Sequence, residues 1–330
     1  MSRESSDTFL RVTDLTKVYK LEAGLFASGS RFVWAVNGVS IDIKKGETYG
    51  LVGESGSGKT TLARALVQLF PHTSGSIEYF TDGEKWEITQ SDPRLLRRYR
   101  ADVKYVFQDP SSSLDPRMSV LRILTAGARY AARAPSAAAL LARAREMMEA
   151  VGLRPDDLGR RPSEFSGGQR QRISLARALI SSPSALVCDE VVSALDVSVQ
   201  GQILNLLIEL KKKFHLTMIF IAHDLTVVSY MADRIGVLYG GRLMEEAPTA
   251  GIVERPLHPY TQLLYGAIPK LGGKLPERGT TTGAPFNPTR KPMGCPFVGR
   301  CPLEQAKCRT VTPDLHEIRP GHRVACHFVA

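Results

Sequence analysis

The sequence predicts an α/β protein organised around a phosphate-binding loop. Residues 53–61 read Gly-Glu-Ser-Gly-Ser-Gly-Lys-Thr-Thr and fit the pattern G-x-x-x-x-G-K-[ST] at every defined position. The loop lies between an apolar run, Thr48–Val52, and residues 61–70, whose apolar side chains recur at helical spacing. Two further apolar runs, 185–188 and 218–222, end in charged or titratable residues, which is typical of buried parallel strands with functional groups at their carboxyl ends.

The loop composition indicates a nucleotide site. Glycines let the backbone fold closely around phosphates, so that N–H groups and the helix N-terminus face the anion. We expect Lys59 to reach the β- and γ-phosphates and the Thr60 hydroxyl to hold Mg²⁺. The alternative is a chance glycine loop before a helix. The predicted nucleotide-binding residues are Gly53, Glu54, Ser55, Gly56, Ser57, Gly58, Lys59, Thr60 and Thr61.

The N-terminal half predicts a β region followed by helices. Residues 8–50 alternate polar and apolar positions between turn signals, which favours antiparallel strands, with a loop inserted at 22–30. Strands are also expected at 76–80 and 103–107. Residues 117–152 are rich in Ala, Arg and Leu, and they predict a helical subdomain that spans about 110–165. The expected helices are 126–133, 136–151, 165–180 and 202–214.

The C-terminal part predicts a hairpin, a linker and a cysteine-bearing tail. Residues 235–239 and 242–245 flank Gly240-Gly241, a hairpin signal. Residues 272–292 hold four prolines and are expected to form a linker or extended arm. Four of the five cysteines lie beyond it, whereas Cys188 lies alone in an apolar run.

The composition is that of a soluble globular chain. Of 330 residues, 43% are hydrophobic and 23% charged. We see no stretch of about 20 apolar residues and no apolar core of a signal peptide, so we expect a cytoplasmic chain. The formal charge of +10 would suit nucleic acid or an anionic membrane surface, but the basic runs at 97–98 and 211–213 are too short to argue for nucleic acid. Nucleotide binding together with scattered solvated Arg and Lys is the simpler explanation of the charge.

Further candidate site residues lie at strand ends. Asp189 and Glu190 close the run 185–188, where the first can orient Mg²⁺ and the second can polarise a water against the γ-phosphate. Gln108 follows the strand 103–107 and can reach Mg²⁺ or the attacking water. His223 follows the strand 218–222 and can touch the γ-phosphate. Taken singly, each of these has a structural explanation.

A second anion cradle is predicted at the start of the helix 165–180. Ser166, Gly167, Gly168 and Gln169 supply a hydroxyl, bare backbone N–H groups and a helix dipole. This second anion-binding site either completes the nucleotide site at residues 53–61 of the same chain or binds the nucleotide that another chain holds. A glycine-rich helix cap is the structural alternative.

In this order, the motifs resemble those of the ATPase subunit of an ATP-binding-cassette (ABC) protein over about residues 8–245. The resemblance implies the P-loop NTPase fold of that family, with an N-terminal antiparallel β subdomain and a helical subdomain. By this resemblance Glu190 is the general base, and His223 is the family's switch histidine, which contacts the γ-phosphate. Gln108 is the glutamine that takes part in catalysis and binds Mg²⁺. Residues 166–169 correspond to the family's signature sequence, which contacts the partner's nucleotide. Phe165 precedes them at a position where the family more often has Leu. Tyr19 becomes a candidate for stacking on adenine.

The resemblance also implies a head-to-tail dimer. Each ATP would lie between one subunit's phosphate loop and the other's signature, with Asp196 of the segment 193–196 beside it. ATP binding would close the dimer and hydrolysis would open it. One departure from the family is Val191-Val192, where a proline usually follows the glutamate. Its absence removes a constraint on the turn that aims Glu190.

The region 246–330 resembles the C-terminal extension of oligopeptide and dipeptide importer ATPases. The similarity lies in Pro-Leu-His-Pro-Tyr-Thr at 256–261 and in the cysteine tail, and the insertion before Asn37 is more similar to the F type than to the D type. The resemblance implies a D-type ATPase partner, two integral membrane permease subunits and, indirectly, an extracytoplasmic solute-binding protein. It places the chain at the cytoplasmic face of the membrane as a peripheral subunit.

The four tail cysteines suggest a metal centre. Their spacings lack the close pairs typical of structural zinc, and four such thiolates can hold a [4Fe–4S] cluster, to which the family resemblance also points. Zinc, reduced thiols and a disulfide remain alternatives. The candidate ligands are Cys295, Cys301, Cys308 and Cys326.

We therefore expect an ATPase that uses ATP and Mg²⁺ to power import of a peptide or related solute. One rival is a soluble ABC ATPase that acts on nucleic acid, which the importer-like extension disfavours. A second is a nucleotide-binding regulator without turnover, suggested by Val191-Val192.

Overall fold

The computed structural model describes residues 7–21, 31–90, 92–127, 136–266, 286–289 and 293–329. The chain forms two compact units. The first unit comprises residues 1–90 and 222–330, and the second comprises residues 91–221.

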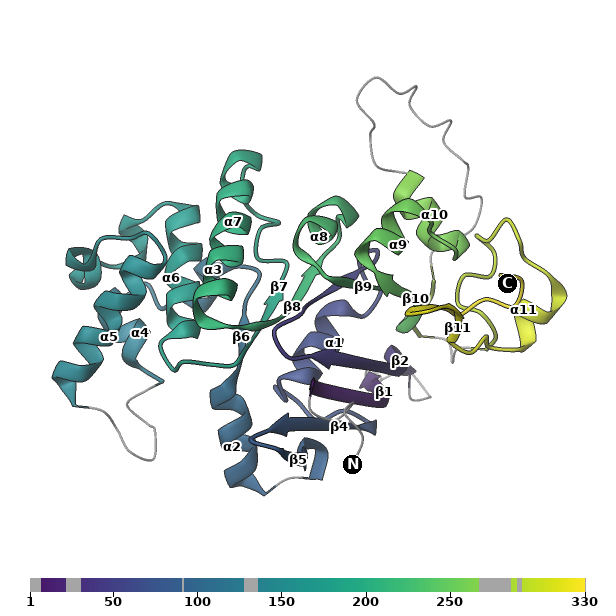
Figure 1. Cartoon of the computed structure of the whole chain (residues 1–330), viewed down its shortest axis with the longest axis horizontal. Helices are drawn as coiled ribbons and strands as arrows, with labels where there is room; N and C mark the ends of the chain where they lie inside the picture. Colours follow the sequence, from purple (N-terminus) through teal and green to yellow (C-terminus); the bar gives the residue numbers. More distant parts are fainter. Residues whose placement is uncertain are drawn as a thin grey trace, which may run out of the picture. The chain divides into compact units, whose positions relative to one another are not determined.

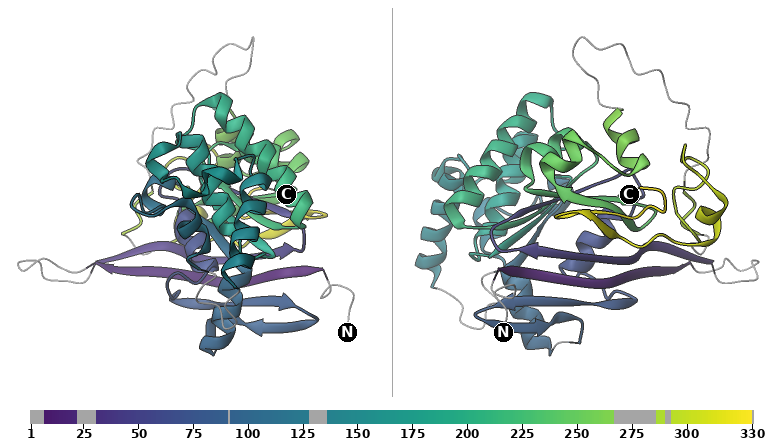
Figure 2. Two further views of the ribbon diagram at one scale, coloured as in Figure 1. Left: turned by 90° about the vertical axis from the view of Figure 1, so that its left-hand side faces the viewer. Right: turned by 45° about the vertical axis from the view of Figure 1, so that its right-hand side comes forward.

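An antiparallel sheet in the first unit confirms the predicted N-terminal β region. Its strand order is β2-β1-β4-β5, with β1 (Thr8–Leu21), β2 (Arg31–Lys44), β4 (Ser74–Thr81) and β5 (Glu84–Glu87). Strands β1 and β2 pair over their whole length, and Figure 2 shows them side by side. Burial alternates clearly along the second half of β2, where Val39, Ile41 and Ile43 are buried between partly exposed neighbours, as on a sheet with one covered face. The loop predicted at 22–30 lies outside the described residues.

A second sheet region carries the phosphate loop. Strand β3 (Thr48–Val52) pairs in parallel with β9 (Arg234–Tyr239), and β9 forms the predicted hairpin with β10 (Arg242–Pro248). Gly240 and Gly241 turn this hairpin with φ of 56° and 76°. The next strands are β12 (His322–Val324) and β11 (His316–Arg319), which the sequence did not predict (Figure 1). The tail therefore extends the sheet, and the expected domain boundary at 245/246 falls inside β10.

The helices of the first unit are short. They are α1 (Lys59–Leu66), α8 (Leu225–Met231), α9 (Thr249–Glu254), α10 (Pro259–Gly266) and α11 (Ala306–Thr310), with a 3-10 turn at Ile88–Gln90. The prediction of a helix over 61–70 was wrong at both ends. Helix α1 begins directly after Gly58, and Gln68 takes a left-handed φ of 55° that ends the helical path.

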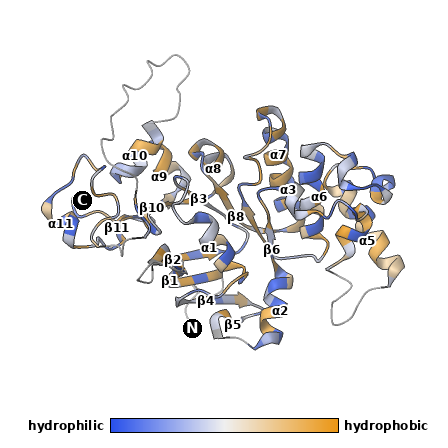
Figure 3. Cartoon of the chain, turned by 180° about the vertical axis from the view of Figure 1, so that it is seen from behind, coloured by the Kyte–Doolittle hydropathy of each residue, from blue (hydrophilic) through white to orange (hydrophobic). Residues whose placement is uncertain are grey.

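In the second unit, three parallel strands confirm the predicted buried runs. These are β6 (Val103–Val106), β7 (Ala185–Asp189) and β8 (Thr217–Ala222), with β7 paired to both others. Every residue of β7 and β8 is buried, and β8 is coloured as hydrophobic in Figure 3. Parallel strands are covered on both faces, so such strands are apolar without alternation.

The helices of the second unit confirm the predicted helical region in outline. They are α2 (Pro93–Asp102), α3 (Pro110–Ser113), α4 (Val120–Thr125), α5 (Ala137–Ala150), α6 (Gly167–Leu179) and α7 (Val197–Phe214), with 3-10 turns at Pro155–Gly159 and Pro162–Glu164. Helix α2 was not predicted; Asp92 caps it by accepting from the Arg94 N–H at 2.9 Å. Helix α7 begins five residues earlier than expected, directly after Asp196 in the N-cap position. The helix expected at 126–133 lies almost entirely outside the described residues.

Across the described ranges, none of the helices is both long enough and apolar enough to cross a membrane. The expected linker at 272–292 lies largely outside the described residues.

Candidate functional site

The phosphate loop has the strand–loop–helix setting that its motif requires. Gly58 takes φ of 105°, and a Cβ atom there would lie 2.2 Å from the carbonyl oxygen of Ala35. A Cβ on Gly53 would lie 2.1 Å from the carbonyl oxygen of Leu238. Backbone atoms cannot move aside easily, so both positions require glycine and the loop stays close to its neighbouring strands.

Two polar groups of this loop suit an anion. Lys59 is 4% exposed, and its ammonium folds back over the loop and donates to the carbonyl oxygens of Gly53 at 2.7 Å and Glu54 at 2.9 Å. Within the described part of the chain, the buried Ser57 hydroxyl forms no hydrogen bond. An anion in the loop would offer both groups a charged acceptor, which forms stronger hydrogen bonds than a carbonyl does.

The other predicted residues of the first unit lie in the loop, in α1 and on two strands or their ends. Ser55 and Gly56 form the exposed tip of the loop, and Thr60 and Thr61 lie in the first turn of α1. His223 is exposed directly after β8, and Tyr19 packs edge-on against Phe70 with ring centroids 5.9 Å apart. The role of Tyr19 at an adenine ring stays a prediction.

In the second unit, the structure brings the predicted carboxylates and amide together. Gln108 Nε2 donates to Glu190 Oε2 at 3.0 Å and to Ser193 Oγ at 3.4 Å. Asp189, 1% exposed at the end of β7, accepts a hydrogen bond from the Tyr105 hydroxyl. Sequence reasoning missed Tyr105, whose signal was its place on the neighbouring strand, three residues before Gln108. This arrangement can hold a cation beside a carboxylate base.

The turn after Glu190 is ordered despite its missing proline. Glu190 takes a left-handed φ of 48°, and its N–H donates to the Ile221 carbonyl at 2.9 Å. The Ser193 N–H closes the turn on the Glu190 carbonyl at 3.1 Å. Val191 and Val192 are 1% and 3% exposed, so these side chains fill the core. Burial and hydrogen bonds thus take over the constraint that a proline would supply.

The predicted signature is the capped start of α6. Ser166 Oγ accepts from the Gln169 N–H at 3.3 Å, and Gln169 Oε1 accepts from the Ser166 N–H at 2.9 Å, which is a capping box. A Cβ on Gly168 would lie 2.7 Å from Val199 Cγ1, so glycine lets α6 approach α7. Residues 166–169 and Asp196 line one cavity of about 270 Å³. The predicted signature and Asp196 therefore lie together.

The four tail cysteines line one small cavity. Cys295, Cys301, Cys308 and Cys326 are free thiols that surround a void of about 10 Å³, close to the volume that one water needs. Burial, together with the neighbouring thiols, raises the pKa of Cys295 to about 11. Among the residues that the structure describes, no group of three or more His, Cys, Asp or Glu side chains has the arrangement of a metal site.

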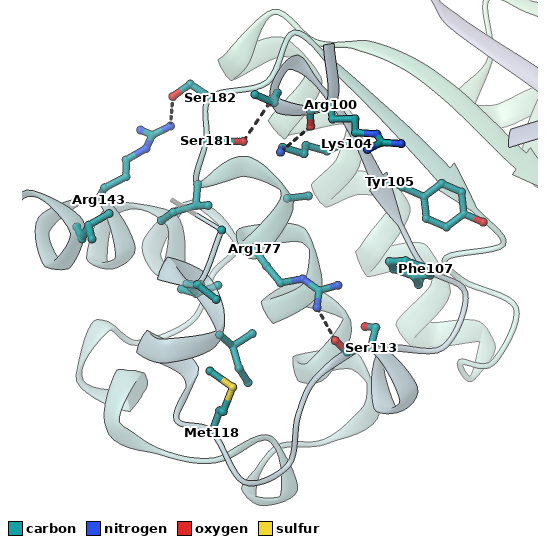
Figure 4. A pocket seen from close by; sticks show the side chains of 18 of the residues that line it. Arg100, Lys104, Tyr105, Phe107, Ser113, Met118, Arg143, Arg177, Ser181 and Ser182 are labelled. Carbon is teal, nitrogen blue, oxygen red and sulfur yellow. Dashed lines mark hydrogen bonds between the residues drawn. The ribbon is translucent and has the colours of Figure 1, made fainter. Parts of the chain in front are cut away.

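A larger basic groove lies in the second unit, and sequence reasoning missed it (Figure 4). Its volume is about 1110 Å³. Asp115 is the one carboxylate among its lining residues, and burial lowers the pKa of Arg177, whose guanidinium donates to the Ser113 carbonyl. Phe107, next to Gln108, also lines it. The lining cations are Arg97, Arg100, Lys104, Arg143 and Arg177.

Comparisons with known proteins identify the family of the chain. Residues 36–193 match the family model described as ABC transporter, and residues 244–308 match the C-terminal region of oligopeptide/dipeptide transporters. The chain is 41% identical over 336 aligned positions to the oligopeptide transport ATP-binding protein AppF of Bacillus subtilis, covering 99% of both. It is 47% identical over 292 positions to a putative peptide import ATP-binding protein of Brucella ovis, covering 88% of this chain and 90% of that one.

Two solved structures share the fold. A dimeric ATP-binding cassette in a post-hydrolysis state, bound to ADP and Pi, has a TM-score of 0.62 and 28% identity over 73% of this chain and 98% of its own. The protein cbiO1 of Clostridium perfringens, part of the ABC transporter complex cbiONQ, has a TM-score of 0.63 and 25% identity over 76% and 92%.

Proposed function

Since the chain belongs to the ABC transporter ATP-binding proteins of the oligopeptide/dipeptide type, we propose how its own residues power import. The chain is an ATPase that drives solute import through an ABC transporter. The observation that carries the residue assignment is the Glu190 carboxylate, held by the Gln108 amide beside the buried Asp189. In this assignment Asp189 orients Mg²⁺ and Glu190 polarises the attacking water.

The first unit supplies the groups that hold ATP. Lys59 binds the β- and γ-phosphates in place of the loop carbonyls that it contacts, and Thr60 holds Mg²⁺. Ser57 gains an acceptor when the phosphates enter the loop. His223 contacts the γ-phosphate and Tyr19 stacks on the adenine.

The signature serves a second ATPase subunit. The cavity formed by residues 166–169 and Asp196 takes the γ-phosphate end of the partner's ATP, so that the nucleotide joins the two chains. The partner is a D-type ATPase, and this chain is of the F type. ATP has a higher affinity for the closed dimer than for the open one, so ATP binding closes the dimer and hydrolysis opens it, and this change can move the membrane subunits.

The basic groove of Figure 4 receives a cytoplasmic segment of an integral membrane subunit. Arg143 is paired with Glu146 at 2.6 Å, but the lining still carries more Arg and Lys than the single carboxylate of Asp115 balances. This excess of positive charge favours a partner segment with acidic and apolar side chains. Phe107 lines the groove and directly precedes Gln108, whose amide contacts Glu190, so we propose that this segment couples the groove to the carboxylate. The chain then works at the cytoplasmic face of the membrane with two permeases and an extracytoplasmic binding protein. The relatives carry peptide-import names, which supports peptides or related solutes and leaves the nucleic-acid alternative without support.

A [4Fe–4S] cluster in the tail remains a proposal that rests on the donor set. Four thiols from separate segments line one cavity, and thiols are the donors that such a cluster takes. Their present arrangement is not that of a metal site, and the void of about 10 Å³ would have to open around a cubane. Zinc at the same thiols is the alternative. A cluster would crosslink the tail. Iron and sulfide analysis of anaerobically purified protein decides between them: one zinc per chain without a brown chromophore would eliminate the cluster.

Coexpression with the neighbouring genes tests the assembly. A complex that contains this chain, a second ATPase and two permeases, and that releases phosphate from ATP, is the expected result. A stable homodimer that does not associate with the permeases but binds DNA would instead support the alternative function on nucleic acid.

A further inference from the structure

The C-terminal extension reaches the phosphate loop at Glu54. The Arg300 guanidinium forms two hydrogen bonds with the Glu54 carboxylate, Nη1 to Oε2 at 2.8 Å and Nη2 to Oε1 at 2.9 Å. The Glu54 N–H donates to the Tyr260 hydroxyl at 2.8 Å. Together with Lys59, which donates to its carbonyl oxygen, three side chains fix this one loop residue. Two of the three come from outside the motif.

Arg300 is itself held firmly. Its side chain is 11% exposed, and its guanidinium lies 5.6 Å from the ring centre of Tyr239 and 5.8 Å from that of Phe297. It also donates to the Tyr239 hydroxyl at 3.1 Å. A planar guanidinium that contacts two aromatic rings and pairs with both oxygens of one carboxylate has few other conformations, so Arg300 fixes the position of Glu54 as well as balancing its charge.

Tyr260 is held in the same aromatic cluster. Its ring is fully buried, 4.5 Å from Tyr239 and 5.4 Å from Phe297 between centroids. The Tyr260 N–H donates to His258 Nδ1 at 3.0 Å. Burial lowers the pKa of His258 to about 4, so the ring is neutral at pH 7 and its Nδ1 can accept. The segment 258–260 therefore presents the tyrosine hydroxyl to the loop from a rigid base.

We propose that Arg300 and Tyr260 are positioning residues of the phosphate loop, so that ATP affinity and the order of the tail are coupled through Glu54. The inference rests on the assignment of residues 53–61 as the ATP site. Arg300 directly precedes Cys301 in the chain, so a tail that loses its order releases the loop. By linkage, ATP bound to the loop strengthens the tail in return.

Substitution of Arg300 tests the coupling. Arg300→Met is expected to raise the ATP Kd about tenfold, within the range for coupled sites, and to raise KM with little change in kcat. Tyr260→Phe is expected to act in the same direction by removing the acceptor of the Glu54 N–H. The control is Arg309→Met, which removes an ion pair of the same tail, between Arg309 and Glu304 at 2.7 Å.

The double variant distinguishes positioning from general damage. Glu54→Gln with Arg300→Met should bind ATP no more weakly than the weaker single variant, because both remove one interaction. Additive losses would overturn the proposal, and so would an Arg300→Met affinity within about twofold of the wild type. If Arg300→Met does not fold, the ATP affinity of Glu54→Gln tests the same contact, because this substitution weakens it from the side of the loop.

Hydrogen exchange provides a measurement that separates coupling from a purely structural role, because only coupling makes amide protection in the tail depend on ATP. ATP should slow exchange of the backbone amides at 295–302 in the wild type and in Arg309→Met, but not in Glu54→Gln or Arg300→Met. Equal protection in all four proteins would refute the coupling. A wild type that binds no ATP would refute the nucleotide-site assignment instead, so the two failures are distinguishable.

Discussion

At the scale of single residues, the carboxylate that we propose as the general base is positioned by its backbone. Glu190 takes a left-handed φ of 48° at the end of a buried strand, which costs energy for a side chain with a Cβ atom. The hydrogen bonds of its N–H to Ile221 and of its carbonyl to Ser193 hold this conformation. The carboxylate is thereby presented to the Gln108 amide.

Glu190→Gln is expected to abolish turnover and preserve ATP binding. The amide keeps an acceptor for Gln108 but cannot take a proton from water, so phosphate release should fall about 10²–10⁴-fold. Phosphate release and nucleotide affinity should be measured on the same preparation. Glu209→Gln, at an exposed position on α7, is the matched control. Hydrolysis that persists at the wild-type rate would remove Glu190 from the role of base.

Cys188 should be chemically inert in the native protein. Burial, with a further contribution from the Asp189 charge, raises its pKa to about 12, so the reactive thiolate forms only at strongly alkaline pH. Treatment with iodoacetamide at pH 8 and peptide mass spectrometry should find Cys188 unmodified, and modified once the protein is denatured. Labelling of Cys188 in the folded chain would contradict its place in the core.

At the scale of elements, strand β10 organises the C-terminal extension through a buried carboxylate. Glu245 is fully buried, and it accepts from the backbone N–H groups of Leu257 at 2.8 Å and His258 at 2.9 Å. His322 Nε2, on β12, lies 2.6 Å from its Oε1. One side chain thus ties together the segment before α10 and the tail strand.

Glu245→Ala is therefore expected to destabilise the protein by about 3 kcal/mol, because it leaves buried donors without their charged acceptor. The free energy of unfolding in urea, monitored by circular dichroism, is the measurement. Glu254→Ala, at an exposed position on α9, should change it little. Equal stability of the two variants would show that the Glu245 network contributes nothing.

The sequence predicted elements whose signal is local and missed those that depend on distant partners. The glycine loop, the apolar runs of β7 and β8 and the residues at their ends follow from motif and composition alone. Strands β11 and β12 have four and three residues, too few for a periodicity, and form only because β10 offers an edge. The contacts of Tyr105 with Asp189 and of Arg300 with Glu54 join residues 84 and 246 positions apart, which no local pattern encodes.

At the scale of the whole molecule, the candidate residues belong to two compact units. The phosphate loop and His223 lie in the first, and Gln108, Asp189, Glu190 and the signature lie in the second. By family membership the chain is an import ATPase of the oligopeptide/dipeptide type, and we propose that both groups of residues serve its ATP hydrolysis. The same division assigns the basic groove and the signature to one unit and the Glu54–Arg300 contact to the other.

Transport by the assembled complex tests the central claim most directly. Proteoliposomes would hold this chain, its partner ATPase and the two permeases, with ATP inside and the binding protein loaded with its labelled solute outside. Hydrolysis at Glu190 should make the solute accumulate with the wild-type chain and not with Glu190→Gln. Equal accumulation with both chains would contradict the claim that ATP hydrolysis by this subunit powers import.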